Sequence, residues 1–466
     1  MRGITKFAAG AFVLLSPAAA SAQTVEELQR QIDELKAELR AMKGAQAAPI
    51  AASPVPATTP IPVPVPSEQV AVAPAPAAPI PAAATEKEDK AWYERLTLRG
   101  YTQMRYNAFV GGDRTAPAGR SRVRSVHDSA INENGNFALR RARLVLQGDI
   151  TDDIALYFQT DFASAVNGQS NGERRENYGQ LRDAYVDVFL DEDHEFKLRL
   201  GQSKVPFGWE NLQSSSNRLT LDRSDGINSA VPSERDIGVV VYYTPKRVQK
   251  IWDRLADDGQ KLFGNYGAFA VGLYNGQGVN RSEQNRGFTK VAMATWPFEL
   301  GGGQVLEVGG AALFNKVRPE VRSGGVSDVD FKDNHYGVHG ILYPQPFGVQ
   351  AEWSWGKTPQ YDLMLPGIRS SKAQGGYVQV MYDVGDIGLG KLIPYGRWQH
   401  YRGGWKAGTN APRLETDEIE VGVEWQIFPA LELTVAYANM KRAEADERRT
   451  GRAEGDLIRT QVQFNY

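Results

Sequence analysis

The strongest constraint on the fold is a two-residue alternation of apolar and polar residues that begins near residue 96 and continues to residue 466. In residues 418–427, EIEVGVEWQI, the acidic residues Glu418, Glu420 and Glu424 occupy one parity and apolar residues the other. Successive side chains of a β-strand point to opposite faces, so the pattern predicts strands with one apolar and one polar face. About sixteen such segments follow one another, and they begin near residues 96, 137, 154, 180, 195, 236, 265, 288, 304, 332, 347, 375, 391, 416, 430 and 456.

The connections between these segments alternate in length. Mostly short turns are interleaved with long connections at 110–136, 164–179, 204–235, 276–287, 316–331, 357–374, 402–415 and 441–455. One further connection, 245–264, has the pattern of a short amphipathic helix. Long loops on one side, short turns on the other and an even number of strands are typical of an outer-membrane barrel. We therefore predict an all-β fold, a 16-stranded antiparallel transmembrane β-barrel; a secreted array of β-sandwiches is the alternative.

The N-terminal part of the chain has a different composition. Residues 1–22 combine a basic start, a short apolar core and Ala20-Ser21-Ala22, which predicts a signal peptide. Residues 23–43 are predicted to form a coiled coil, and 44–91 a Pro/Ala-rich linker before the barrel domain, 92–466. Export and a barrel together predict the outer membrane, with the coiled coil in the periplasm. The coiled-coil prediction rests on apolar residues spaced three and four apart: Val25, Leu28, Ile32, Leu35, Leu39 and Met42.

The polar parity of the strands is predicted to line the lumen of the barrel, and it carries both signs of charge. We expect about half of these charges to pair across strands, and the remainder to set a field that sorts solutes. The basic residues are Arg99, Arg105, Arg141, Arg143, Lys197, Arg199 and Arg459, and the acidic ones are Asp149, Asp161, Asp183, Asp187, Glu418, Glu420 and Glu424.

One segment, 201–224 (GQSKVPFGWENLQSSSNRLTLDRS), does not alternate. Pro206 cannot donate to a strand ladder and Gly208 permits a sharp bend, so the strand should end there. If the segment folds into the lumen, residues 204–224 form a constriction that offers hydroxyl, ammonium and guanidinium donors to an anion. An ordinary surface loop is the alternative. The candidate donors are Lys204, Ser214, Ser215, Ser216, Arg218 and Arg223.

Four stretches of the chain resemble the phosphate-selective porins of the O and P type: FALRRARLVLQGDITDDIALYFQTDF, LRDAYVDVFL, LRLGQSKVPFGWENLQSSSNRLTLDRS and RDIGVVVYY. The resemblance covers roughly residues 96–466. It implies a trimer of sixteen-stranded barrels, a third loop folded into each pore, and an arginine and lysine pathway that draws anions to a phosphate site. Members of the family often carry an N-terminal coiled coil.

The residues that match the family pattern are Ser214, Ser215, Arg223 and the pair Arg140-Arg141. Phosphate-specific members place a lysine in the loop just before the serines. This chain has Trp209-Glu210-Asn211-Leu212-Gln213 there, without a lysine, so the identity of the anion stays open.

Other classes of function fit the sequence less well. A net charge of −2 argues against a nucleic-acid binder, and the absence of cysteine excludes a thiol nucleophile. His335 and His339 would lie about 13 Å apart along a strand, too far to share a metal ion. We therefore predict no enzyme activity, metal or cofactor.

The predicted function is passive diffusion of small anions, phosphate or related oxyanions, through a homotrimer embedded in outer-membrane lipid. The alternative is a general small-solute porin whose coiled coil and linker tether the outer membrane to the peptidoglycan of the cell wall.

Overall fold

The computed structural model describes residues 91–116, 121–123, 128, 131, 135–164 and 178–466, all within one compact unit. The predicted signal peptide, the coiled coil and the linker up to residue 90 lie outside the described residues. So do parts of the first two long connections.

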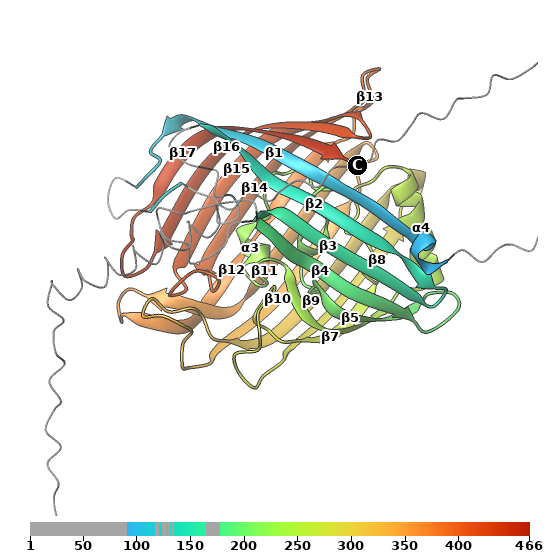
Figure 1. Cartoon of the computed structure of the whole chain (residues 1–466). Coiled ribbons are helices and arrows are strands. Elements are labelled where there is room, and N and C mark those ends of the chain that lie inside the picture. The colour runs from blue at the N-terminus through green and yellow to red at the C-terminus, as the bar shows by residue number, and fades with distance from the viewer. Residues whose placement is uncertain (1–90, 117–120, 124–127, 129–130, 132–134, 165–177) are drawn as a thin grey trace, which may run out of the picture. The chain divides into compact units, whose positions relative to one another are not determined.

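The described chain forms a closed antiparallel β-barrel (Figure 1). Strand β1 (Leu96–Gly112) pairs with β2 (Asn136–Thr151) along one edge and with the last strand, β17 (Ala453–Asn465), along the other. The intervening strands are β3 (Ile154–Ser164), β4 (Tyr178–Phe189), β5 (Phe196–Lys204), β6 (Arg235–Tyr243), β7 (Phe269–Tyr274), β8 (Thr289–Glu299), β9 (Val305–Val317), β10 (Phe331–Leu342), β11 (Phe347–Asp362), β12 (Gly367–Tyr382), β13 (Gly385–Asp386), β14 (Lys391–Gly404), β15 (Arg413–Phe428) and β16 (Leu431–Ala445).

The predicted sixteen-stranded barrel is confirmed, with one addition. The extra strand, β13, consists of two residues in the turn between β12 and β14. The prediction was wrong at the connection 357–374, because β11 continues to Asp362 and β12 begins at Gly367. These two strands pair along their whole length, so a hairpin replaces the expected long loop.

Within the described residues, five short helical segments accompany the strands: η1 (Trp92–Arg95), α2 (Trp209–Leu212), α3 (Asp225–Asn228), α4 (Lys246–Asp257) and η2 (Gly301–Gly303). The predicted amphipathic helix in 245–264 corresponds to α4. Its buried residues Val248, Ile251 and Leu255 are spaced three and four apart and lie on one face. None of the helices in the described part of the chain is long and apolar enough to span a membrane.

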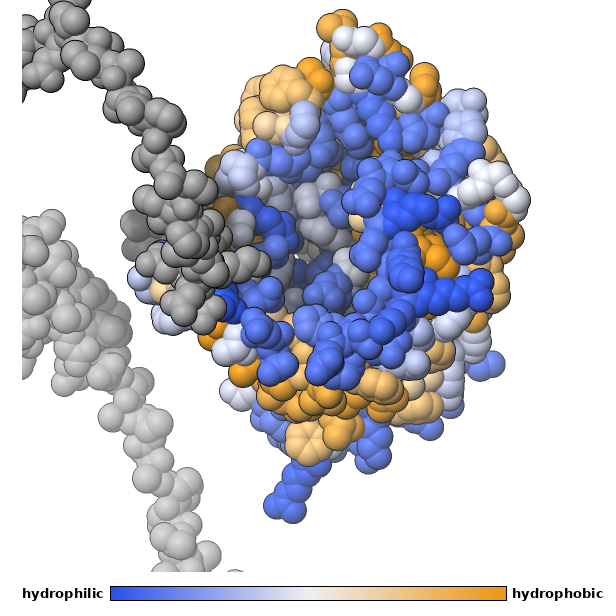
Figure 2. All heavy atoms as spheres, turned by 90° about the vertical axis from the view of Figure 1, so that its right-hand side faces the viewer, coloured by the Kyte–Doolittle hydropathy of each residue, from blue (hydrophilic) through white to orange (hydrophobic). Residues whose placement is uncertain are grey.

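The alternation along each strand separates a lipid-facing surface from the lumen. In β15, Ile419 and Val421 are exposed on the outside, whereas Glu418, Glu420 and Glu424 are buried inside. Seen from the right-hand side of Figure 1, the barrel end is hollowed, and mostly hydrophilic residues surround the hollow (Figure 2). The polar parity of the sequence therefore lines an interior, and the apolar parity faces outward.

The outward placement of Val421, near the middle of β15 and 55% exposed, makes a testable prediction. Val421→Arg should lower the free energy of unfolding in lipid vesicles by about 2–4 kcal/mol, the cost of arginine near the bilayer midplane. Val384→Arg, in the turn after β12 and 48% exposed, should cost only about 0–1 kcal/mol at the interface. Urea titration measures both values; equal costs would contradict the lipid-facing placement of Val421.

Candidate functional site

The chain between β5 and β6, residues 205–234, lies inside the barrel and is called the inner loop here. Nearly all its side chains are buried, and it contains α2 and α3. Gly208 caps the start of α2 with φ of +83°, and a Cβ atom there would lie 2.3 Å from Ile227 Cγ2. A residue with a side chain would be strained and would clash, so the sharp bend expected at Pro206–Gly208 needs this glycine.

Apolar side chains of the inner loop pack against one side of the lumen. Val205, Phe207, Trp209 and Leu212 share a buried cluster with inward-facing residues of β6–β10 and with α4. The ring centroid of Trp209 lies 5.8 Å from that of Phe263 and 6.5 Å from that of Tyr343. Burial of this apolar surface holds the loop against β6–β10.

Hydrogen bonds hold the inner loop against β11, and close backbone packing holds it against β12. The Glu352 carboxylate on β11 accepts hydrogen bonds from the backbone N–H groups of Trp209 (2.7 Å) and Glu210 (2.6 Å), at the start of α2. The Ser354 hydroxyl donates to the backbone carbonyl of Gly226 in α3. Gly226 packs so closely on the backbone of β12 that an added Cβ would lie 2.3 Å from Gly375 C.

Ion pairs extend the docking to β14, β15 and β16. Arg397 Nη1 on β14 lies 2.6 Å from Glu210 Oε1. Asp225 Oδ2 in α3 accepts from Arg442 Nη1 on β16 and from Thr416 Oγ1 on β15, both at 2.6 Å. The inner loop connects β5 to β6, and it thus contacts strands on the opposite side of the barrel.

A third contact region joins the inner loop to β1 and β17. Asp222 lies 2.9 Å from Arg105 Nη1 and 2.6 Å from Arg459 Nη2, and Asp128 contacts the same two guanidinium groups at 2.8 and 3.0 Å. Burial alone would raise the pKa of Asp222, but Arg105 and Arg459 hold it well below its usual range. The four charges compensate one another, so Arg105 is not a free anion ligand here.

A β-bulge in β2 brings two successive arginines to the lumen. Gln103 of β1 is paired with Arg141 and Met104 with Leu139, so Arg140 is the extra residue. Arg141 Nη1 donates to Gln103 Oε1 at 2.7 Å, and Arg140 Nη2 lies 3.9 Å from the Asp222 carboxylate. Strict alternation would have placed Arg140 outside.

Lys204 and Arg223, both predicted anion ligands, hold the inner loop together. Lys204 Nζ donates to the carbonyl oxygens of Leu212 (2.9 Å) and Gln213 (3.0 Å). Arg223 donates to the carbonyls of Glu210 (3.2 Å) and Gln213 (2.8 Å) and lies 3.0 Å from Glu234 Oε1.

Arg141 and Arg218 differ from most of the other lumen arginines because neither lies within ion-pair distance of a carboxylate among the described residues. They are 4% and 5% exposed, and Arg141 Nε and Arg218 Nε and Nη1 have no hydrogen-bond acceptor among the described residues. Burial, followed by the positive charge of Arg223, lowers the pKa of Arg218 to about 9, so the group remains protonated at neutral pH. Their guanidinium groups therefore carry positive charge that is in no ion pair with a described carboxylate.

Among the described residues, several cavities lie beside the inner loop, and two of them are lined by predicted anion ligands. One, of about 510 Å³, brings together four predicted residues, Arg99, Arg143, Lys204 and Ser214, with Arg235, which the sequence pattern did not single out. Arg99 donates to Gln147 at 2.9 Å, and Arg143 pairs with Asp161 at 2.8 Å.

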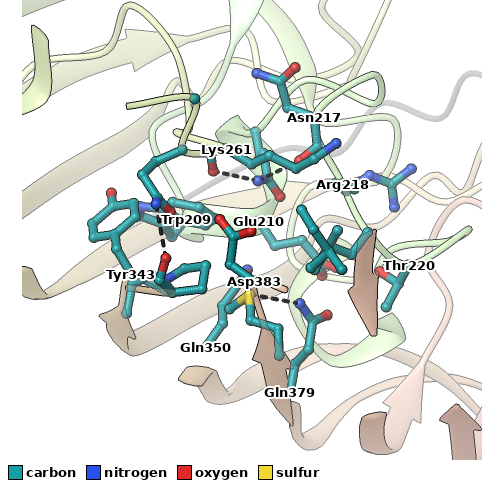
Figure 3. Close-up of a pocket in the computed structure, with 18 of the residues that line it drawn as sticks. Trp209, Glu210, Asn217, Arg218, Thr220, Lys261, Tyr343, Gln350, Gln379 and Asp383 are labelled. Carbon is teal, nitrogen blue, oxygen red and sulfur yellow. Dashed lines mark hydrogen bonds between the residues drawn. The ribbon is translucent and has the colours of Figure 1, made fainter. Parts of the chain in front are cut away.

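The other cavity measures only about 30 Å³, and Figure 3 shows its lining. Trp209, Glu210 and Arg218 border it, together with Tyr343. A space of this size holds one or two waters, so the loop closes against this part of the wall.

A second inward segment, which sequence reasoning missed, follows α4. Gln213 Nε2 of the inner loop donates to the Lys261 carbonyl at 2.8 Å, and Lys261 Nζ lies 2.7 Å from Glu424 Oε1. Strand β6 carried a signal for this packing: RDIGVVVYY is apolar on both parities, and Val240 and Tyr242 point inward into the buried cluster.

The remaining predicted donors, Ser214 and Ser215, lie at the turn of the inner loop. Ser214 Oγ is 2.8 Å from Ser216 Oγ, and Ser215 Oγ accepts weakly from Arg223 Nη1 at 3.4 Å. The Ser215 carbonyl accepts from Gln103 Nε2 at 3.0 Å, which places this turn beside Arg141.

The sequence model of the family described as phosphate-selective porin O and P matches residues 122–466. This chain belongs to that family. Membership places the porin among the β-barrels of the outer membrane and indicates a channel rather than an enzyme. No curated protein matches the chain.

Several solved structures are similar to the porin. OmpF of Salmonella typhi, in complex with daunomycin, has a TM-score of 0.50 at 13% identity, and the match covers 80% of this chain and 97% of that one. The channel DcaP of Acinetobacter baumannii has a TM-score of 0.47 at 14% identity, with coverage of 80% and 97%. An anion-selective porin from Comamonas acidovorans has 0.45 at 12%, with coverage of 80% and 99%. The similarity to OmpF concerns the fold alone.

The close packing of α3 on β12 makes a second testable prediction. Gly226→Ala should displace the inner loop, because the new methyl group would overlap the β12 backbone. Single-channel conductance should become heterogeneous while the barrel remains folded by its electrophoretic mobility. Gly301→Ala is the matched control, since a Cβ there meets nothing within 4 Å. Unchanged conductance in the Gly226 variant would show that the docking of α3 does not influence the pore.

Proposed function

We propose that the porin mediates passive diffusion of small anions, phosphate or related oxyanions, across the outer membrane. Solutes enter among the long loops, pass a constriction formed by residues 204–224 of β5 and the inner loop, and leave on the short-turn side without energy input. The single observation that carries the anion preference is that Arg141 and Arg218, both buried in the lumen, have guanidinium nitrogens without an acceptor and no ion-pair carboxylate among the described residues.

The arginine pair favours anions because a buried N–H group without an acceptor is costly. An oxyanion offers several strong acceptors and negative charge, and its hydrogen bonds to guanidinium are charge-assisted. Arg218 is among the positive charges that act on Arg141. Water can fill the same role between passages, so an anion need not remain bound.

The acidic residues of the inner loop do not oppose this preference. The Glu210 carboxylate is held by Arg397 at 2.6 Å and accepts from the Ser224 N–H at 2.8 Å. Asp222 is compensated by Arg105 and Arg459. Glu210 stands in the stretch that carries a lysine in phosphate-specific members, but its charge is already neutralised by the barrel wall.

Lys204 places its Nζ near the position of that missing lysine. Its Nζ contacts the Leu212 and Gln213 carbonyls, directly before Ser214, and it lines the 510 Å³ cavity. We propose that anions follow this side of the lumen, along β2–β5, past Arg99 and Lys204. The opposite side is closed by the docking of the loop on β11–β14.

We also propose that the porin is a homotrimer whose coiled coil, residues 23–43, lies in the periplasm. The strict heptad spacing in that segment supports an oligomer. Chemical cross-linking in intact outer membranes tests this; a ladder that stops at the monomer would contradict it.

The anion preference is tested in planar bilayers under a KCl gradient. The reversal potential of the wild type should report anion selectivity, and Arg141→Gln with Arg218→Gln should reduce it, because two lumen charges without an ion-pair partner among the described residues are lost. Arg95→Gln is the control, since Arg95 pairs with Asp152 near the start of the barrel, away from the inner loop. Cation selectivity in the wild type, or an unchanged potential in the double variant, would refute the proposal.

The same planar-bilayer measurement tests whether the porin prefers phosphate to chloride. Phosphate added at a concentration far below that of chloride should reduce the chloride current of the wild type, because a divalent oxyanion interacts more strongly with the arginine pair. The double variant should lose this block. If added phosphate does not reduce the chloride current, the porin conducts anions without preferring phosphate.

A further inference from the structure

Four lysines form a row on the outside of the barrel, called the lysine band here. Lys316 of β9, Lys332 of β10, Lys357 of β11 and Lys372 of β12 are all exposed on the parity that faces away from the lumen. Their strands are neighbours in the sheet, as Figure 1 shows for β10–β12. The four lysines therefore occupy one continuous patch.

The register of the strands places like charges opposite each other. Lys316 is the direct cross-strand partner of Lys332, and Lys357 is the direct partner of Lys372. Directly opposed like charges destabilise a sheet. No carboxylate within the described ranges lies within ion-pair distance of any of the four. Negative charge from outside the chain would relieve the repulsion between these lysines.

The next strands of the barrel are different in this respect. Arg402 of β14 lies 3.2 Å from Glu415 Oε1, and Arg413 of β15 contacts the same carboxylate. Their charges are partly compensated within the sheet. On the other side of the band, Lys290 of β8 is exposed opposite Phe314 and also has no ion-pair carboxylate among the described residues, so the uncompensated charge extends over β8–β12.

A row of aromatic side chains lies next to the lysine band. Phe314, Tyr336 and Trp355 are exposed on the same outward parity, with ring centroids 5.7 Å apart for the first pair and 6.2 Å for the second. Lys316 and Lys357 follow Phe314 and Trp355 by two residues, about 7 Å along the strand. Aromatic girdles mark the interface of a barrel with the bilayer, so the lysines stand at the level of the lipid headgroups.

The band lies at the long-loop end of the barrel, the end that faces outward in outer-membrane barrels. Lys316 precedes the connection 318–330, and Lys332 follows it. On β1–β3, the outward positions near the same end are occupied by Val110, Phe137 and Phe162. The positive charge is therefore a local feature and not a general property of this rim.

We propose that the lysine band binds the phosphate groups of lipid headgroups in the outer leaflet. Three of the four lysines line an outward-facing groove of about 890 Å³, and the fourth, Lys316, is the cross-strand partner of Lys332. Ammonium groups supply the charge for phosphate, and the aromatic floor contacts the apolar part of the lipid. This site lies outside the lumen and does not depend on which solute the pore conducts. The groove is lined by Lys332, Lys357, Lys372 and Arg402 with Tyr336 and Trp355.

The test titrates the purified full chain in neutral detergent with diphosphorylated lipid A and measures bound lipid by native mass spectrometry. The quadruple Lys→Gln variant of residues 316, 332, 357 and 372 should bind at least about tenfold more weakly than the wild type, and the quadruple Lys→Arg variant should bind like it. A charge-matched control replaces Lys246, Arg247, Lys250 and Arg254 of α4 by Gln and should leave binding unchanged. Removing one phosphate from the lipid should weaken binding to the wild type, and added inorganic phosphate at equal concentration should not displace the lipid.

Three results would overturn the proposal. The Lys→Gln variant could bind the lipid as tightly as the wild type, or the lipid could bind equally well without its phosphate. The variant could also change oligomeric state in the absence of lipid, which would make the band a contact between protein subunits. Electrophoretic mobility before and after heating shows whether each variant is folded.

Discussion

Closure of the strand ring is the constraint on which the rest of the molecule depends. The hydrocarbon core of a bilayer offers no partners to backbone N–H and C=O groups, so every strand must be paired on both edges. Strand β1 meets this condition only by pairing with β17, more than 300 residues away in the chain, from Tyr101–Asn465 to Gly112–Gly455. A ring of sixteen strands then encloses a lumen of set circumference, and everything inside must fit that space.

The inner loop meets this requirement with two kinds of contact. Toward β6–β10 it buries apolar side chains such as Trp209 and Phe207, and toward β11–β17 it forms ion pairs through Glu210, Asp222 and Asp225. Buried ion pairs contribute little net stability, but breaking one leaves an uncompensated charge. The pairs therefore fix the position of the loop. They also compensate most of the lumen charges, which leaves Arg141 and Arg218 as lumen arginines without an ion-pair partner among the described residues.

Much of the barrel was predictable because its period is local. The alternation within each strand shows which of its faces is polar, and it predicted most of the strand starts, whereas the start of β12 was placed at 375 and lies at Gly367. Helix α4 was predicted separately, from its own amphipathic spacing. The connection 357–374 failed because KTPQYD and GIRSSKAQ show no clear alternation, yet they pair residue by residue as a hairpin. The roles of the site residues were harder to predict from the sequence. Lys204 and Arg223 have the right chemistry for an anion ligand, but local sequence cannot reveal that backbone carbonyls already occupy them.

The sequence by itself determined the class of fold, the inward and outward parity of the strands, and the break at Pro206–Gly208 that lets the chain leave the wall. These properties depend on neighbouring residues and on the conformations that proline and glycine allow. Only the tertiary structure decided which charges remain uncompensated. Glu210 meets Arg397 across 187 positions, and Arg140 turns inward through a bulge defined by its partner strand. Charges compensate one another through space, so residues far apart in the sequence can be partners. The sequence alone therefore does not show which charges are paired.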